Sequence, residues 1–264
     1  MVKYSSNAIA KTSVLAMVTL IIFGFSSNRR NSDHCRFVKL VYKLEFIKPD
    51  NAEMVVMQDT LGIIYYGNYI AYQIPNEFTL SNVNMDKDQN VISENVIREE
   101  TKYSYMVYNK NKNYGYMFDS IGAIKAAKVS VDSFLLKRAF KNFPFYNSVI
   151  DSLVSTSTKN ESLVETRICK EKKDESFNDT IHYFYKKGFE KIDYTFSKYL
   201  DSTRNLKLYK IQMIFNPIPK GKYAFAVPKR EFLFELKPNE TFNSKELTVF
   251  FENFKKRENM DSAN

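Results

Sequence analysis

The chain has 264 residues, 44% of them hydrophobic, which excludes an intrinsically disordered protein. Its net charge of +9 comes from scattered lysines without a dense basic stripe, so we expect a basic surface and no nucleic-acid partner. Two cysteines are too few for a disulfide-stapled mini-fold or a four-cysteine metal site.

The chain begins with a segment typical of an export signal. The apolar run Val14 to Phe25 would span about 18 Å as a helix, which is short for a membrane core of about 30 Å. Lys3 and Lys11 precede it, and Ser26 ends it with a small residue. We therefore predict a signal peptide over 1–26 and an exported protein, periplasmic or associated with the cell envelope, with no stable membrane span after cleavage. A retained anchor is the alternative.

The residues that follow predict a β-rich domain. After a disordered segment at 27–36, apolar and polar residues alternate over 37–47, the period of a half-buried strand. Gly67-Asn68 between two aromatic-rich runs predicts a hairpin over 62–74, and further hairpins are predicted over 102–118 and 181–196. Two later segments are less regular: 129–140 favours a longer strand or a strand followed by a turn, and 147–156 is ambiguous, with Val149, Ile150 and Leu153 at helical spacing.

The C-terminal part of the chain predicts an amphipathic helix over 244–258. Leu247, Phe250, Phe251 and Phe254 follow the spacing of one helix face. We expect this face to be buried on the sheet; a membrane-surface or partner helix is the alternative. The predicted fold is mainly β: one strongly curved antiparallel sheet, or a sandwich, of about ten strands in a single domain at 37–258, followed by a disordered tail at 259–264.

No recognised catalytic or metal-binding motif occurs in the sequence, so no catalytic, cofactor or metal residue is predicted. His182 lies in a predicted strand, where a packed or surface imidazole is expected. Asp86, Asp88 and Asn90 match the first calcium-binding positions of an EF-hand loop, but Val91 stands where that loop needs glycine. We interpret this segment as a polar hairpin loop.

Cys35 and Cys169 are the candidates for a single disulfide. Export would make the bridge chemically possible. Nothing in the sequence brings the two residues together, so free thiols remain the alternative.

The 22 Phe and 18 Tyr residues suggest either a packed core or an apolar groove. We predict an exported, non-enzymatic envelope protein that binds an apolar ligand or another envelope protein; a lipid and a peptide are the other candidate partners. The alternatives are a structural component of a surface assembly and a hydrolase without a recognised motif. The ligand-binding residues and the oligomeric state are not predicted.

Three segments carry a resemblance to a known family: "KLVYKLEFIKPDN", "YMVYNKNKNYGYMFDS" and "DYTFSKYLDSTRNLKLYKIQMIF". With the short export signal, they resemble secreted β-rich proteins of Bacteroidota of the GLPGLI family, although the Gly-Leu-Pro-Gly-Leu-Ile motif and tryptophan are absent. The resemblance implies an envelope protein and assigns no functional residue. A curved sheet of this kind also looks like that of periplasmic lipoprotein carriers.

Overall fold

The computed structural model describes residues 35–48, 53–141, 151–159, 161–172, 177–189, 192–221, 225–239 and 244–262. The chain divides into two units, Met1–Asp33 and His34–Asn264, and all the described residues belong to the second. The predicted signal peptide at 1–26 lies outside the described residues. No helix among the described residues is long and apolar enough to cross a membrane.

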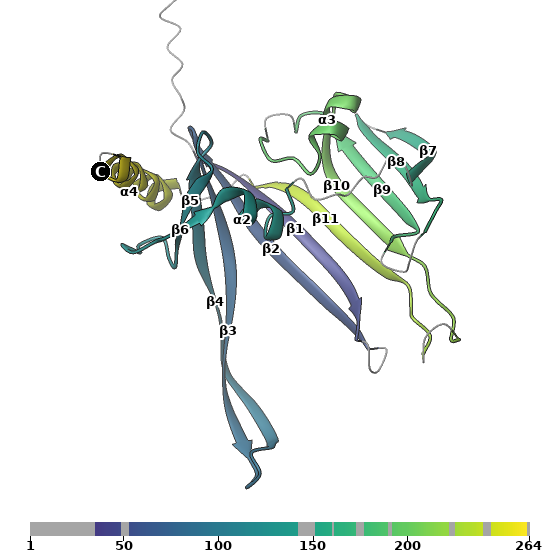
Figure 1. Ribbon diagram of the computed structural model, residues 1–264, viewed down its shortest axis with the longest axis horizontal. Helices are drawn as coiled ribbons and strands as arrows, with labels where there is room; N and C mark the ends of the chain where they lie inside the picture. Colours follow the sequence, from purple (N-terminus) through teal and green to yellow (C-terminus); the bar gives the residue numbers. More distant parts are fainter. Residues whose placement is uncertain are drawn as a thin grey trace, which may run out of the picture. The chain divides into compact units, whose positions relative to one another are not determined.

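The described residues form one curled, unclosed antiparallel sheet of eleven strands (Figure 1). This confirms the predicted curved sheet and decides against a sandwich. The strands are β1 (Arg36–Ile47), β2 (Met54–Tyr66), β3 (Tyr69–Met85), β4 (Val91–Asn109), β5 (Tyr114–Phe118), β6 (Ala127–Ser130), β7 (Asp151–Lys159), β8 (Ser162–Cys169), β9 (Thr180–Lys186), β10 (Lys207–Phe215) and β11 (Arg230–Asn239).

The sheet consists of two meanders that meet at its centre. The strand order is β6-β5-β4-β3-β2-β1-β11-β10-β9-β8-β7, so the first strand of the chain pairs with the last. Leu40 of β1 lies opposite Leu61 of β2 on one side and Leu236 of β11 on the other. This long-range pairing joins the two halves into one domain.

The second half of β2, from Leu61 to Tyr66, is buried on both faces. Leu61, Ile63 and Tyr65 of β2 belong to the hydrophobic cluster on the first face, and Ile64 and Tyr66 belong to a second cluster on the other face. A strand covered on both sides reads as a continuous apolar run, which explains the sequence of β2 around these residues.

Helix α2 (Val131–Lys137) covers part of the first face, where the sequence favoured a strand over 129–140. Only Ala127–Ser130 is a strand, and Ser130 then caps the helix by accepting a hydrogen bond from the Ser133 backbone N–H. Val131, Phe134 and Leu135 are buried at helical spacing. A short apolar run does not distinguish the two periods, so the strand prediction was wrong here. In the other ambiguous segment, residues 151–159 form strand β7, and 147–150 lie outside the described residues.

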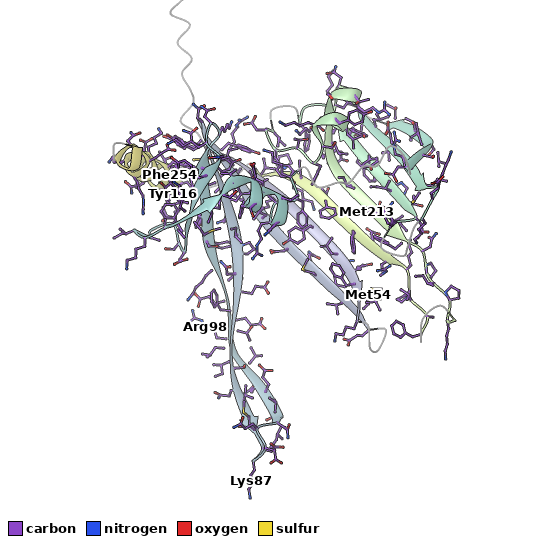
Figure 2. All side chains as sticks on the ribbon, viewed as in Figure 1. Met54, Lys87, Arg98, Tyr116, Met213 and Phe254 are labelled. Atoms are coloured by element: carbon purple, nitrogen blue, oxygen red, sulfur yellow. The ribbon has the colours of Figure 1, made fainter. Side chains whose placement is uncertain are left out.

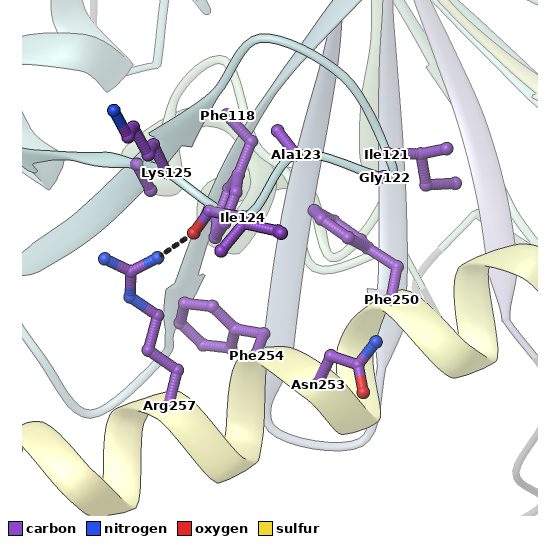
Figure 3. Close-up of a pocket in the computed structure, with 11 residues that line it drawn as sticks. Phe118, Ile121, Gly122, Ala123, Ile124, Lys125, Phe250, Asn253, Phe254 and Arg257 are labelled. Carbon is purple, nitrogen blue, oxygen red and sulfur yellow. Dashed lines mark hydrogen bonds between the residues drawn. The ribbon is translucent and has the colours of Figure 1, made fainter.

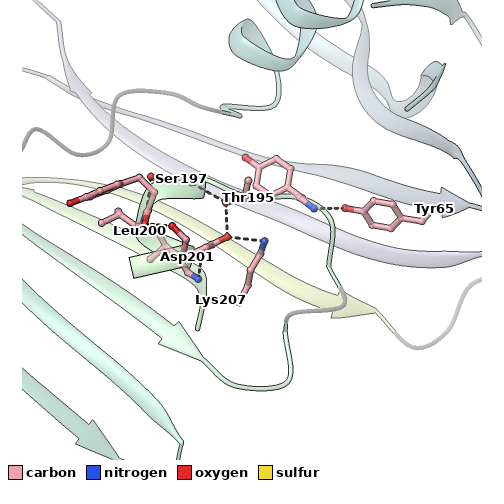
Figure 4. Close-up of polar contacts among 10 residues, drawn as sticks. Tyr65, Thr195, Ser197, Leu200, Asp201 and Lys207 are labelled. Atoms are coloured by element: carbon pink, nitrogen blue, oxygen red, sulfur yellow. Dashed lines mark hydrogen bonds and ion pairs between the residues drawn. The ribbon is translucent and has the colours of Figure 1, made fainter. Parts of the chain in front are cut away.

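The predicted hairpin over 181–196 is correct only in its first half. β9 forms, but the described residues from Ile192 to Ser197 are irregular and lead into helix α3 (Lys198–Arg204). Tyr194 is fully buried on the first face, where its backbone N–H donates to the Tyr65 hydroxyl over 3.1 Å (Figure 4). The segment alternates because its side chains enter the core, not because it pairs with a strand.

An ion pair fixes the same segment to β10. The Asp201 carboxylate accepts from the Thr195 hydroxyl at 2.6 Å, pairs with the Lys207 ammonium at 2.9 Å and accepts from the Leu208 backbone N–H at 2.8 Å (Figure 4). One carboxylate therefore holds both the entrance to α3 and the strand that follows it.

The C-terminal helix α4 (Ser244–Ser262) covers the second face, as predicted. Leu247, Phe250, Phe251 and Phe254 are all buried. The Phe251 ring stacks on Tyr66 at a centroid separation of 5.1 Å. The helix continues four residues beyond its predicted end at Glu258.

Candidate functional site

Aromatic side chains fill the centre of the first face in the part of the chain that the structure describes. Tyr72 and Tyr183 of the sheet are fully buried there, together with Tyr194 and Phe196 from the segment that leads to α3. The aromatic residues on this part of the curved sheet are therefore core.

A pocket of about 790 Å³ lies on the second face, between α4 and the loop that joins β5 to β6. Figure 3 shows its lining, with the aromatic rings of Phe118, Phe250 and Phe254 beside the loop residues 121–125. A volume of this size is typical of small-molecule sites in proteins.

The local sequence explains why this space is open. Phe118 ends β5, and its ring meets Phe250 edge to face at a centroid separation of 5.3 Å, which forms an aromatic floor. The wall above it includes Gly122, Ala123 and Ala126, whose small side chains leave the space between loop and helix unfilled.

Arg257 joins the loop to the helix at one end of the pocket. Its Nη1 donates to the Ile124 carbonyl over 2.6 Å, and its guanidinium carbon lies 5.6 Å from the centre of the Tyr116 ring (Figure 3). Because a planar guanidinium has five N–H groups, this contact leaves Arg257 able to donate to a further acceptor. Lys125 is exposed on the same loop. All the charged residues that line the pocket are therefore cationic.

Ile124 makes the loop unusual. Its side chain is 89% exposed although it lines an apolar pocket. A large aliphatic side chain in this position gains stability when an apolar group covers it, at about 25 cal/mol per Å² removed from water. The pocket thus combines an aromatic floor, an exposed aliphatic side chain and two cations.

A second hollow of about 540 Å³ lies on the first face, at the base of the β3–β4 hairpin. The Tyr42 hydroxyl donates to Asp59 over 3.1 Å, and burial together with the Asp59 carboxylate raises the pKa of Tyr42 to about 12. Lys102, Asp119 and Arg138 also line it. Charges of both signs partly offset one another, so this hollow defines no single kind of ligand.

A cluster of buried charges on β8 is a structural ion-pair network and not an active site. Glu165 is 1% exposed and pairs with the guanidinium groups of Arg167, at 3.4 Å, and Arg204. A carboxylate enclosed by two cations is not accessible to a substrate. Among the described residues, no group of three His, Cys, Asp or Glu side chains is placed to hold a metal ion.

Cys35 and Cys169, the candidates for a disulfide, lie far apart on the sheet. Both thiols are free and half-buried. Cys35 precedes β1 and Cys169 ends β8, four strand positions away, which corresponds to about 19 Å of sheet width. A disulfide needs Cα atoms about 4.4–6.8 Å apart, so this fold opposes the bridge.

His182 and the turn at 86–90, which the sequence analysis considered as candidate sites, also lie outside the pocket under α4. The His182 ring nitrogen Nδ1 lies 2.9 Å from the Thr166 hydroxyl on the neighbouring strand, and burial lowers the pKa of His182. Asp86 to Asn90 form the turn between β3 and β4, where the Asp86 carboxylate accepts from the backbone N–H groups of Asp88 and Asn90. The hairpin-loop interpretation of this segment is confirmed.

The residues of the β5–β6 loop were not predicted from the sequence to form part of a site. Their only signal is a run of small and aliphatic residues, Ile121 to Ala126, where a polar turn would be expected.

Fold and pocket together describe a mainly β protein with an apolar, cation-rimmed site beneath its C-terminal helix. No known protein family and no curated protein sequence matches the chain. A solved structure from Vibrio parahaemolyticus, described as a candidate outer membrane lipoprotein-sorting protein domain, is 10% identical; the match covers 89% of this chain and 96% of that one with a TM-score of 0.25. A score this low transfers neither fold nor function. The resemblance to GLPGLI proteins stays a prediction.

Proposed function

We propose that this protein is a non-enzymatic binding protein of the cell envelope that holds an elongated apolar ligand with an acidic head group, such as a long-chain fatty acid, in the pocket under α4. The observation that carries the proposal is the composition of the pocket lining. Aromatic and aliphatic residues form the floor and wall, and the charged residues in the lining are Lys125 and Arg257.

Each part of the pocket suits one part of such a ligand. The rings of Phe118, Phe250 and Phe254 offer an apolar surface for a hydrocarbon chain, whose burial stabilises the complex by about 0.8 kcal/mol per CH₂ group. The guanidinium of Arg257 and the ammonium of Lys125 offer charge-assisted hydrogen bonds to a carboxylate. Export, predicted from residues 1–26, would place the protein beside the membranes of the cell envelope.

The proposal is tested by fluorescence titration of the purified protein with a naturally fluorescent polyunsaturated fatty acid. We expect saturable binding with one site per chain, and competition by unlabelled fatty acids. The matching fatty alcohol should compete less well because it has no charge to pair with the cations.

Three variants make the test specific. Ala123→Trp should abolish binding because the indole occupies the pocket, and Lys125→Gln should weaken binding of the acid but not of the alcohol. Lys128→Gln is the matched control, since Lys128 on β6 is also exposed but does not line the pocket. Binding that survives Ala123→Trp, or that falls equally in both lysine variants, would contradict the proposal.

A further inference from the structure

The long hairpin of β3 and β4 leaves the sheet and continues alone. β3 pairs with β2 only from Tyr69 to Gln73, and β4 pairs with β5 only from Tyr105 to Tyr108. Residues 74–85 and 91–104 therefore pair only with each other, as a two-stranded ribbon. We call residues 74–104 the arm; Figure 1 shows it running past the other strands, and Arg98 and Lys87 mark it in Figure 2.

The arm carries apolar side chains that no part of its own domain covers. Nine of the twenty large hydrophobic residues that are exposed in the described chain belong to it: Phe78, Leu80, Val83, Met85, Val91, Ile92, Val96, Ile97 and Tyr103. An isolated two-stranded ribbon is marginally stable in water, and apolar residues on it gain nothing from exposure. A contiguous exposed set of this kind marks an interaction surface.

Two β-bulges each present one of these exposed residues. The register shifts between Leu80 and Ser81 and between Asn84 and Met85, so that Ile97 and Ile92 have no opposite residue. Their side chains are 56% and 69% exposed. Bulges redirect side chains and increase local twist, and here both present an isoleucine to solvent.

The charge of the arm selects the kind of partner. It contains six Asp and Glu residues against three Lys and Arg, whereas the remainder of the chain has 36 Lys and Arg against 24 Asp and Glu. Arg98 and Lys102 both pair with Glu100 on the arm itself, at 3.0 and 3.9 Å, so the outward charge is mainly negative. An anionic membrane surface would repel it, whereas the basic body of the same protein would attract it.

We propose that the arm docks on the basic body of a second copy of this chain, so that the protein associates head to tail. The contact is heterologous, because arm and body are different surfaces, and repetition of it produces a ring or an open chain. The strands of the arm are about 40 Å long, and their two faces and free edges offer an area on the order of the 800 Å² per partner of a stable interface. This inference does not depend on a ligand in the pocket under α4.

Sedimentation equilibrium of the purified protein over a range of concentrations tests the proposal. We expect reversible association that weakens as NaCl is raised from about 50 to about 500 mM, because salt screens the attraction between exposed charges. Ile92→Asn combined with Ile97→Asn should raise the dissociation constant by about tenfold or more. Glu99→Lys should also weaken association, and most strongly at low salt.

The control is Leu136→Asn, which removes a comparably exposed aliphatic side chain from α2. It should leave association unchanged. Because Ile92 and Ile97 are exposed and belong to neither core cluster, their variants should keep the unfolding midpoint of the wild type. Replacement of residues 76–102 by Asn-Gly gives a second variant that lacks all of the arm except its base. A wild-type protein that is monomeric at every concentration, or association that persists without the arm, would overturn the proposal. So would a monomer whose arm binds phosphatidylethanolamine–phosphatidylglycerol vesicles in flotation, since the partner would then be a membrane.

Discussion

The stability of the second face depends on how well the aromatic residues of α4 pack, and Phe251→Ala measures this directly. Phe251 is completely buried, and its ring lies against Tyr66 at 5.1 Å with an interplanar angle of 17°. Truncation of a buried Phe costs about 3–5 kcal/mol through lost transfer energy and the cavity left behind. Loss of a stacked aromatic pair contributes about 0.5–1.5 kcal/mol beyond the area effect. We therefore expect a loss in the upper half of that range, a large part of the about 5–15 kcal/mol that stabilises a domain.

Urea unfolding followed by far-ultraviolet circular dichroism provides the measurement, with Val249→Ala as the control. Val249 lies on the same helix but is 59% exposed, so its truncation should change the free energy of unfolding by less than about 0.5 kcal/mol. A loss below about 1 kcal/mol for Phe251→Ala would refute the packing argument. Unchanged stability together with reduced binding to liposomes would instead favour a membrane-surface helix.

Two further predictions concern the first face and the thiols. Tyr65→Phe should lower the free energy of unfolding by about 1–3 kcal/mol, because the buried backbone N–H of Tyr194 loses the hydroxyl that accepts from it at 3.1 Å. The control is Tyr103→Phe on the exposed arm, which should change the free energy of unfolding little. Equal effects of the two substitutions would contradict the role of this hydrogen bond. Titration of the denatured, unreduced protein should find two free thiols per chain, since Cys35 and Cys169 lie four strand positions apart. A monomer without a titratable thiol would show that the strand order between β1 and β8 is wrong.

The sequence predicted the helix face of the candidate site but not the loop that completes it. The helical spacing of Phe250 and Phe254 predicted a buried face, and the structure confirms it. The pocket itself arises because the loop Ile121–Ala126 passes over that helix, more than 120 residues away in the chain. Lys125 and Arg257 become neighbours of one site only through this packing, so no motif could have joined them.

The alternation of apolar and polar residues predicted which segments are strands. It did not predict which other elements pack against those strands. Alternation identified β1, and the Gly67-Asn68 turn identified the hairpin of β2 and β3, because side-chain period and turn conformation are properties of a few consecutive residues. The same alternation misled over 192–197, where Tyr194 and Phe196 enter the core from an irregular segment. In β1 the alternation accompanies strand pairing, whereas Tyr194, Thr195 and Phe196 are three consecutive buried residues outside any strand.

The sequence by itself therefore determined a β-rich chain with an apolar N-terminal segment and an amphipathic C-terminal helix. Only the tertiary structure decided that β1 pairs with β11, that the second half of β2 is covered on both faces, and that β3 and β4 continue as a free arm. The physical reason is the same in each case. A strand's own residues set its period, whereas the neighbours that fill its hydrogen bonds and cover its faces come from distant parts of the chain.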